Sequence, residues 1–395
     1  MRTISIKKLC LTSMLLGLAL LLAACGGNTG TTAQASPTTS RPASTGTAAV
    51  TPSPGIRLGP QACPDAVKSP SYWDSIIPTQ PNTSKVESVT CGYLKGVPTL
   101  QALVTVRFNG SGQILDVYVY DNLSAATPTQ IFKLQNLVDG DAKISGYNTV
   151  LTAEADTASS VNKNKPDTAL TQDLFREFKW SDGAGTLVQI AFPGIFPDLT
   201  RYQAEDDQAQ VNQGQQSWKL SATQTAQALG ASLFQWNANA PATLVSGGGP
   251  HDVQAVVSLK NSSPGSSAIT ITMDRLEGNT NGGIWIVTDV ESAGLSITQP
   301  QSASLIQGST TITGTGSAFE GVIGKVTILD HLYTTIGQAT VHGATGNGHT
   351  TFSTSVTAQP TFNGGAEEGL IMLTSENNAS GGVAGAVIVK VLIQK

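Results

Sequence analysis

Short runs in which apolar and polar residues alternate begin near residue 100 and predict β-strands. Leu100 to Phe108 and Ile114 to Tyr120 alternate in this way, and the Asn109-Gly110 step between them is a strong signal for a hairpin. Tyr147 to Glu154 predicts a further strand, whereas Thr127 to Val138 predicts a short helix. This first region is therefore expected to be a small α+β unit.

A polar connector from Ser159 to Thr168 precedes a second region with a different pattern. Phe175 to Trp180 and Thr186 to Phe192 flank a turn sequence and predict a second hairpin. Asp198 to Gln213 then predicts a helix that Gly214 ends.

A second helix is predicted to begin at Ser221, because Ser221 and Gln224 match a capping box. The apolar residues that follow are spaced three or four apart, which indicates an amphipathic helix. Its apolar side is expected to lie on an antiparallel sheet, so the region is predicted to be α+β. The strands of that sheet are predicted at His251 to Leu259, Ala268 to Leu276 and Ile284 to Val290.

The last hundred residues lose the helical period, and β-rich runs recur about every 8–12 residues, which is the spacing of a sandwich. Seven such runs predict an all-β immunoglobulin-like fold. They are Ser304 to Ile306, Thr310 to Thr315, Gly324 to Asp330, Thr335 to Val341, Thr350 to Val356, Gly369 to Ser375 and Val383 to Ile393.

This C-terminal region resembles Gmad2, the immunoglobulin-like domain of bacterial spore-germination proteins. The resemblance is carried by Ile297 to Pro300, Thr311 to Gly321, Val326 to Asp330, Gly369 to Thr374 and Val387 to Val389. It implies an exported lipoprotein and carries no catalytic residues. The Phe-Glu-Gly element is the most characteristic part of the resemblance. Phe319 in it is expected to pack in the core, and Glu320 is expected to accept hydrogen bonds from neighbouring amides. His331-Leu332-Tyr333 departs from the turn that the family often has.

The N-terminus predicts export. Arg2, Lys7 and Lys8 precede an apolar run that is short for the ~20 residues of a bilayer span. Leu22-Ala23-Ala24-Cys25 closes the run and resembles the lipobox of bacterial lipoproteins, which implies cleavage after Ala24 and a lipid on Cys25. An uncleaved anchor helix and plain secretion remain alternatives.

After Cys25 the chain is rich in Thr, Ser, Ala, Gly and Pro, a composition that favours a disordered tether with a reach of roughly 30–35 Å. The expected organisation is a signal peptide over 1–24, the tether over 25–61, the first α+β unit over 62–158, the second over 159–294 and the sandwich over 295–395.

Charge excludes one class of partner. The chain has 22 Lys and Arg against 27 Asp and Glu, with only 12% charged residues and no basic block, so a nucleic-acid partner is not expected. Beyond Cys10 and Cys25, only Cys63 and Cys91 remain, and in an exported protein they are expected to pair. A metal or redox pair is the alternative for these two residues.

Candidate chemistry is sparse. The best surface candidates for ligand binding are Trp73, Trp218 and His251, the last of which follows a glycine-rich loop. His342 and His349 have no third ligand at metal spacing, so no metal site is expected, and no catalytic constellation or cofactor motif is found.

These observations predict a non-enzymatic protein held by lipid on the outer face of the cytoplasmic membrane. There it is expected to act as a binding or envelope-assembly module, with a germination-related role as one option, and its partner is expected to be an envelope protein or polysaccharide. The alternative is a surface hydrolase that acts on cell-wall polymers through an unrecognised site in residues 62–294. A solute-binding module is disfavoured because no long β-α-β series occurs.

We expect Cys25→Ala to abolish acylation, because the thioether needs this thiol. Lipid labelling followed by membrane fractionation measures the change, and the variant should leave the membrane fraction. Unchanged labelling would contradict the lipobox assignment.

Overall fold

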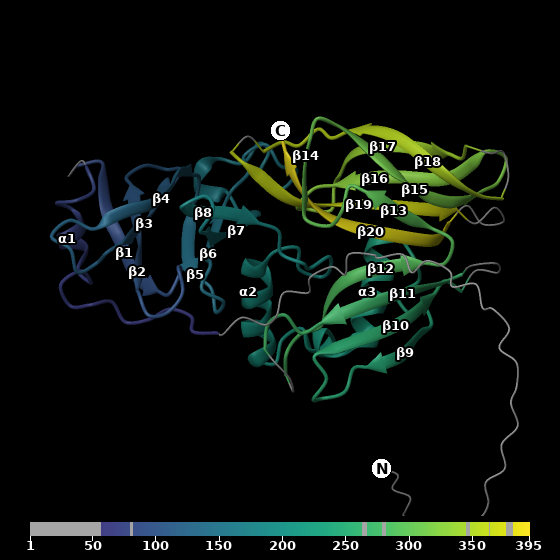
Figure 1. Ribbon diagram of the computed structural model, residues 1–395, viewed down its shortest axis with the longest axis horizontal. Helices are drawn as coiled ribbons and strands as arrows, with labels where there is room; N and C mark the ends of the chain where they lie inside the picture. The colour runs from purple at the N-terminus through teal and green to yellow at the C-terminus, as the bar shows by residue number, and fades with distance from the viewer. Residues whose placement is uncertain are drawn as a thin grey trace, which may run out of the picture. The chain divides into compact units, whose positions relative to one another are not determined.

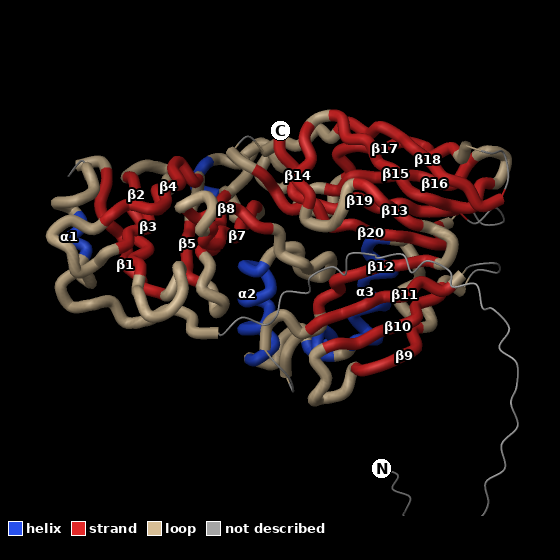
Figure 2. Tube along the Cα trace, in the orientation of Figure 1, coloured by secondary structure: helices blue, strands red, loops and turns tan. Residues whose placement is uncertain are grey.

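A computed structural model of the protein describes residues 57–79, 82–262, 267–278, 282–344, 348–362, 364–376 and 382–395. The chain is mostly β, with 47% strand and 11% helix, and its sheets are largely antiparallel (Figure 1, Figure 2). The sequence pattern predicts an all-β fold only for the C-terminal region. In the structure, the regions before it also consist mainly of strands.

The first sheet has the order β1-β2-β3-β4. The hairpin around Asn109-Gly110 is confirmed, since β2 and β3 pair antiparallel with Val104 opposite Tyr118. The predicted helix over Thr127 to Val138 is wrong, because that segment is strand β4 and pairs with β3. The strands are β1 (Ser84–Gly92), β2 (Gln101–Phe108), β3 (Leu115–Asp121) and β4 (Thr129–Leu137).

A disulfide and a short helix close one face of this sheet. The Cys63–Cys91 disulfide is confirmed and ties the segment before α1 (Pro70–Trp73) to the end of β1. Trp73, the last residue of that helix, is fully buried and donates a hydrogen bond from Nε1 to the carbonyl of Val67 at 2.7 Å. The expectation that Trp73 is a surface residue is therefore wrong, because α1 turns its side chain onto the sheet beside Tyr120.

The second sheet has the order β5-β6-β7-β8 and includes the hairpin predicted at Phe175 to Phe192. Strand β6 pairs with β7, with Thr152 opposite Arg176, so this sheet runs across the boundary expected after residue 158. The connector between them contains the single turn η1 (Asp167–Ala169). The strands are β5 (Asp141–Ile144), β6 (Val150–Glu154), β7 (Leu174–Ser181) and β8 (Thr186–Ile190).

Both longer helices are capped at their first turn. Helix α3 begins at the predicted Ser221 cap, whereas the helix predicted from Asp198 begins at Arg201 instead, because Thr200 caps it. The hydroxyl of Thr200 accepts from the backbone N–H of Gln203 at the start of α2 (Arg201–Asn212). The hydroxyl of Ser221 accepts from the N–H of Gln224 at the start of α3 (Ala222–Leu233), after the short turn η2 (Ser217–Leu220). Helix α3 covers the sheet of β9–β12, as the amphipathic pattern predicts. Those strands are β9 (Ala242–Gly247), β10 (Gln254–Lys260), β11 (Ala268–Asp274) and β12 (Ile286–Ser292).

All seven C-terminal runs are strands, and a short eighth strand precedes them. The order β17-β16-β19-β20 continues through β12 into β11, β10 and β9, and β14 pairs with β20 in parallel. A separate sheet β13-β15-β18 packs over part of this large sheet around a shared apolar core. The strands are β13 (Ser296–Gln299), β14 (Ser304–Gln307), β15 (Ser309–Ala318), β16 (Val322–Leu329), β17 (Thr335–His342), β18 (Gly348–Thr357), β19 (Ala366–Glu376) and β20 (Val383–Gln394).

The expectation that Phe319 fills the core is wrong. Phe319 is 56% exposed, and its backbone exchanges two hydrogen bonds with Val322 across a two-residue turn between β15 and β16. Glu320 and Gly321 both have positive φ there, as a tight primed hairpin turn requires. Because side chains alternate along β15, Ala318 points inward and Phe319 points to solvent.

Residues 1–56 lie outside the described residues, so the predicted signal peptide, Cys25 and nearly all of the predicted tether have no structural description. No helix among the described residues is both long and apolar enough to cross a membrane.

We expect the double variant Cys63→Ala with Cys91→Ala to unfold about 3–4 kcal/mol more easily, because the native cross-link spans 28 residues and restricts the unfolded chain. Denaturant unfolding followed by the fluorescence of buried Trp73 measures this, while hydrogen exchange in β19 and β20 serves as the control. Two free thiols in the native protein would contradict the pairing.

Candidate functional site

The large sheet has a seam between β12 and β20. These two strands are joined by a single residue pair, Val290 opposite Ile388, whereas β19 and β20 pair along eleven positions. A side-chain bond beside it helps hold the strands together: the hydroxyl of Ser292 accepts from the N–H of Ala386 at 2.8 Å. Away from these contacts the strands diverge, and they leave space on one face of the sheet.

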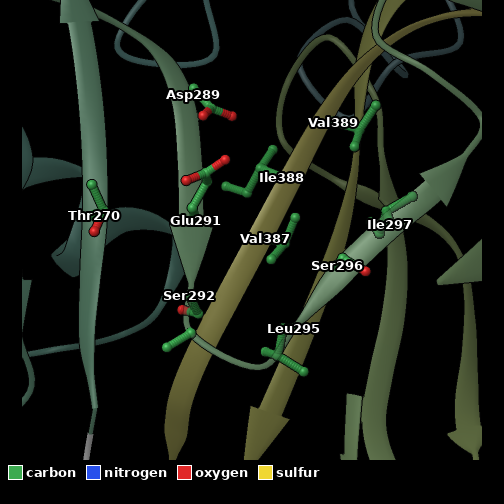
Figure 3. Close-up of a pocket in the computed structure, with 11 residues that line it drawn as sticks. Thr270, Asp289, Glu291, Ser292, Leu295, Ser296, Ile297, Val387, Ile388 and Val389 are labelled. Carbon is green, nitrogen blue, oxygen red and sulfur yellow. The ribbon is translucent and has the colours of Figure 1, made fainter. Parts of the chain in front are cut away.

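That space is a groove of about 490 Å³ (Figure 3). Its apolar side is formed by β20 and by the chain entering β13, and its polar side by Thr270 of β11 and the outer residues of β12. Val290, between the polar residues, points to the opposite face and is fully buried in the core under α3. The apolar lining is Leu295, Ile297, Val387, Ile388 and Val389.

Two carboxylates, those of Asp289 and Glu291, lie on the β12 side of this groove (Figure 3). They are two positions apart on one strand, so both side chains project from the same face. The pKa of Asp289 is raised to about 6, mainly by burial and in part by the charge of Glu291 and a hydrogen bond with it. The pair is therefore a place where one proton or one cation relieves the repulsion between two negative groups.

A second groove of about 380 Å³ lies at the C-terminal end of α3, against β16 and β19. Its charged residues are Lys325 and Glu376, which have opposite sign. It has no pair of like charges comparable to Asp289 and Glu291, so the first groove is the stronger candidate.

None of the three residues that the sequence suggested for ligand binding lines the groove beside Asp289 and Glu291. Trp73 is buried in the first sheet, Trp218 is half-buried against the core under α3, and His251 is exposed before β10. Sequence reasoning missed Asp289 and Glu291. The signal that marks them is two acids separated by one apolar residue in a predicted strand.

Histidines contribute no metal centre in the described part of the chain. Among those residues, no group of three or more His, Cys, Asp or Glu side chains is placed to hold a metal ion. His342 and His349 are both exposed, near the end of β17 and the start of β18. His331 instead lies buried in a turn, with Nδ1 paired to the carboxylate of Glu367.

Comparison with known proteins assigns the chain to no family. The chain matches no protein-family model and no curated protein. Function must therefore be argued from the residues and the groove.

We expect Glu291→Gln to lower the pKa of Asp289 from about 6 toward the ordinary value of about 3.9, because the variant removes the neighbouring negative charge. Carboxyl-carbon NMR titration measures the shift, and the distant exposed variant Asp65→Asn is the control.

The same pair affects stability. Because the pKa of Asp289 is raised in the folded state, the native state holds this proton more tightly than the unfolded chain does. The contribution of Asp289 to the free energy of unfolding therefore falls as pH rises from about 4 to about 6. Glu291→Gln should reduce this loss of stability with pH, which denaturant unfolding at about pH 4 and about pH 6 measures. An Asp289 that titrates identically in both proteins would contradict the coupling.

Proposed function

We propose that the protein is a non-enzymatic, lipid-anchored bacterial surface protein that binds an envelope component. The lipobox-like Leu22 to Cys25 and the Ser/Thr/Pro-rich stretch after it support the anchor and tether. The seven C-terminal strands and the two packed sheets support an immunoglobulin-like sandwich similar to Gmad2. In this proposal the preceding α+β regions are carried together with the sandwich and hold the binding groove at their junction.

The observation that carries the binding proposal is the Asp289–Glu291 pair beside an apolar wall. A ligand that fits such a groove has a cationic group on an aliphatic stem: the stem covers Ile297 and Val389, and the cation neutralises the carboxylates. Lysine side chains of an envelope protein and diamino acids of wall peptides share this chemistry. The groove volume of about 490 Å³ lies within the range of small-ligand sites.

A surface hydrolase remains the second candidate function, because a carboxyl group with a pKa of about 6 suits proton transfer near neutral pH. The geometry argues against glycoside hydrolysis by this pair. Asp289 and Glu291 are hydrogen-bonded to each other, whereas retaining glycosidases hold their carboxyl groups about 5–5.5 Å apart and inverting ones further. Release of fragments from purified cell wall by the protein would favour the hydrolase.

We expect tetralysine to bind the full chain and tetraglutamate not to bind. Asp289→Asn and Glu291→Gln should each weaken tetralysine binding at least about fivefold, because each removes one partner of a charge-assisted hydrogen bond. Binding should strengthen as pH rises through about 6, since Asp289 then loses its proton. Isothermal titration calorimetry measures these affinities.

Asp65→Asn removes an equally negative group that is almost fully exposed and pairs with Lys68, far from the groove in sequence, so it is the matched control. An equal loss of affinity in Asp65→Asn would show that tetralysine responds to net charge and not to the groove.

A further inference from the structure

A lysine and a glutamate meet in the interior, away from the groove. Lys390 lies in β20 and Glu368 in β19, on adjacent antiparallel strands where Lys390 is opposite Leu370. Their exposed fractions are 2% and 1%, and Lys390 Nζ lies 3.2 Å from Glu368 Oε2. Lys and Glu are among the residues least often buried completely, so this pair calls for a role.

The surroundings orient both reacting groups. Nζ donates hydrogen bonds to the backbone carbonyls of Gly194 at 2.9 Å and Leu199 at 2.6 Å. A neutral amine has two N–H donors, so with both of them on these carbonyls its lone pair is left for the side facing Glu368. On the glutamate, Oε1 accepts from the backbone N–H of Phe192 at 3.1 Å, which polarises the carboxyl group toward attack.

Burial favours the neutral forms that such an attack needs. Burial is the main reason that the pKa of Glu368 is raised to about 7. The charge of Lys390 and the hydrogen bonds from Lys390 and the Phe192 N–H oppose the rise, and the nearby charge of Glu177 supports it. Burial also lowers the pKa of Lys390. In water the ionised amine and carboxylate are strongly favoured over an amide, but a dry interior penalises both charges and removes that preference.

We propose that Lys390 and Glu368 condense into an intramolecular amide that links β20 to β19. The Nζ–Cδ bond forms and the Cδ–Oε2 bond breaks. Oε2 leaves as water with two of the three protons that the ammonium carried, and the third stays on the amide nitrogen. Atoms and charge balance without any oxidant, reductant or co-reactant.

The proposed link would hold β20 in the middle of the large sheet. Strand β20 is the last in the chain and pairs with β19, β12 and β14, so peeling it away would separate the sheet at its centre. An amide to β19 prevents that peeling without relying on noncovalent contacts. This is a useful property for a protein exposed outside the cell.

The unaltered full chain is the first test. Lys390 is the only Lys or Arg between Lys325 and Lys395 in the sequence, so trypsin cuts an unlinked chain into residues 326–390 and 391–395. The link consumes the ammonium that trypsin recognises. We therefore expect one peptide over residues 326–395, lighter than its sequence mass by one water, with fragment ions that join position 368 to position 390.

Recovery of residues 326–390 at full sequence mass, with an amine that reacts with an acylating label, would overturn the proposal. An uncut peptide 326–395 at full sequence mass would overturn it too, because it shows a missed cleavage without a bond.

Three variants assign the bond. Lys390→Met and Glu368→Ala should each lose the water deficit. Glu367→Gln is the matched control, since the neighbouring Glu367 is equally buried but pairs with His331, and it should keep the deficit. A deficit that disappears in Glu367→Gln, or fragment ions that place the link on Glu367, would contradict the assignment to Glu368. The result on the unaltered chain stands even where a variant does not fold.

Discussion

The buried side chain of Lys390 ties the large sheet to a distant segment of the chain. It is buried in β20 with Glu368 at 3.2 Å, and its hydrogen bonds reach the carbonyls of Gly194 and Leu199, almost 200 residues earlier in the chain. The last strand thereby holds the segment that enters α2, in addition to its backbone pairing with β19, β12 and β14. In a chain without the amide, removing one partner would leave a buried charge uncompensated, which typically costs about 3–5 kcal/mol.

Other buried charges join the same regions. Arg176 of β7 pairs with Glu154 and donates to the carbonyl of Gly364 at 2.6 Å, while Arg201 of α2 lies between Glu177 and Glu277. Such networks contribute geometric specificity more reliably than net stability. Strands β12 and β20 themselves are joined by the Val290–Ile388 pair and the Ser292–Ala386 hydrogen bond, and the groove with its carboxylate pair lies beside that narrow contact.

Local patterns succeeded where neighbouring residues decide the conformation. The Asn109-Gly110 hairpin and the Ser221 cap are set by turn and capping chemistry within a few residues. Local patterns failed where contacts with residues distant in sequence decide the conformation. Thr127 to Val138 lacks a decisive period and becomes a strand because the edge of β3 offers it backbone partners, and Phe319 is exposed because a two-residue turn fixes its side of the strand.

The sequence alone determined a mostly β C-terminal region, the positions of its strands, the start of helix α3 at the Ser221 cap and the Cys63–Cys91 pair. Each of these follows from alternation, capping or cysteine arithmetic within one stretch of chain. Only the tertiary structure decided that β12 meets β20 at one residue pair, that Asp289 and Glu291 face a groove, and that Lys390 meets Glu368. Those contacts join segments far apart in sequence, and the charge state of each group is set by how much water its neighbours exclude.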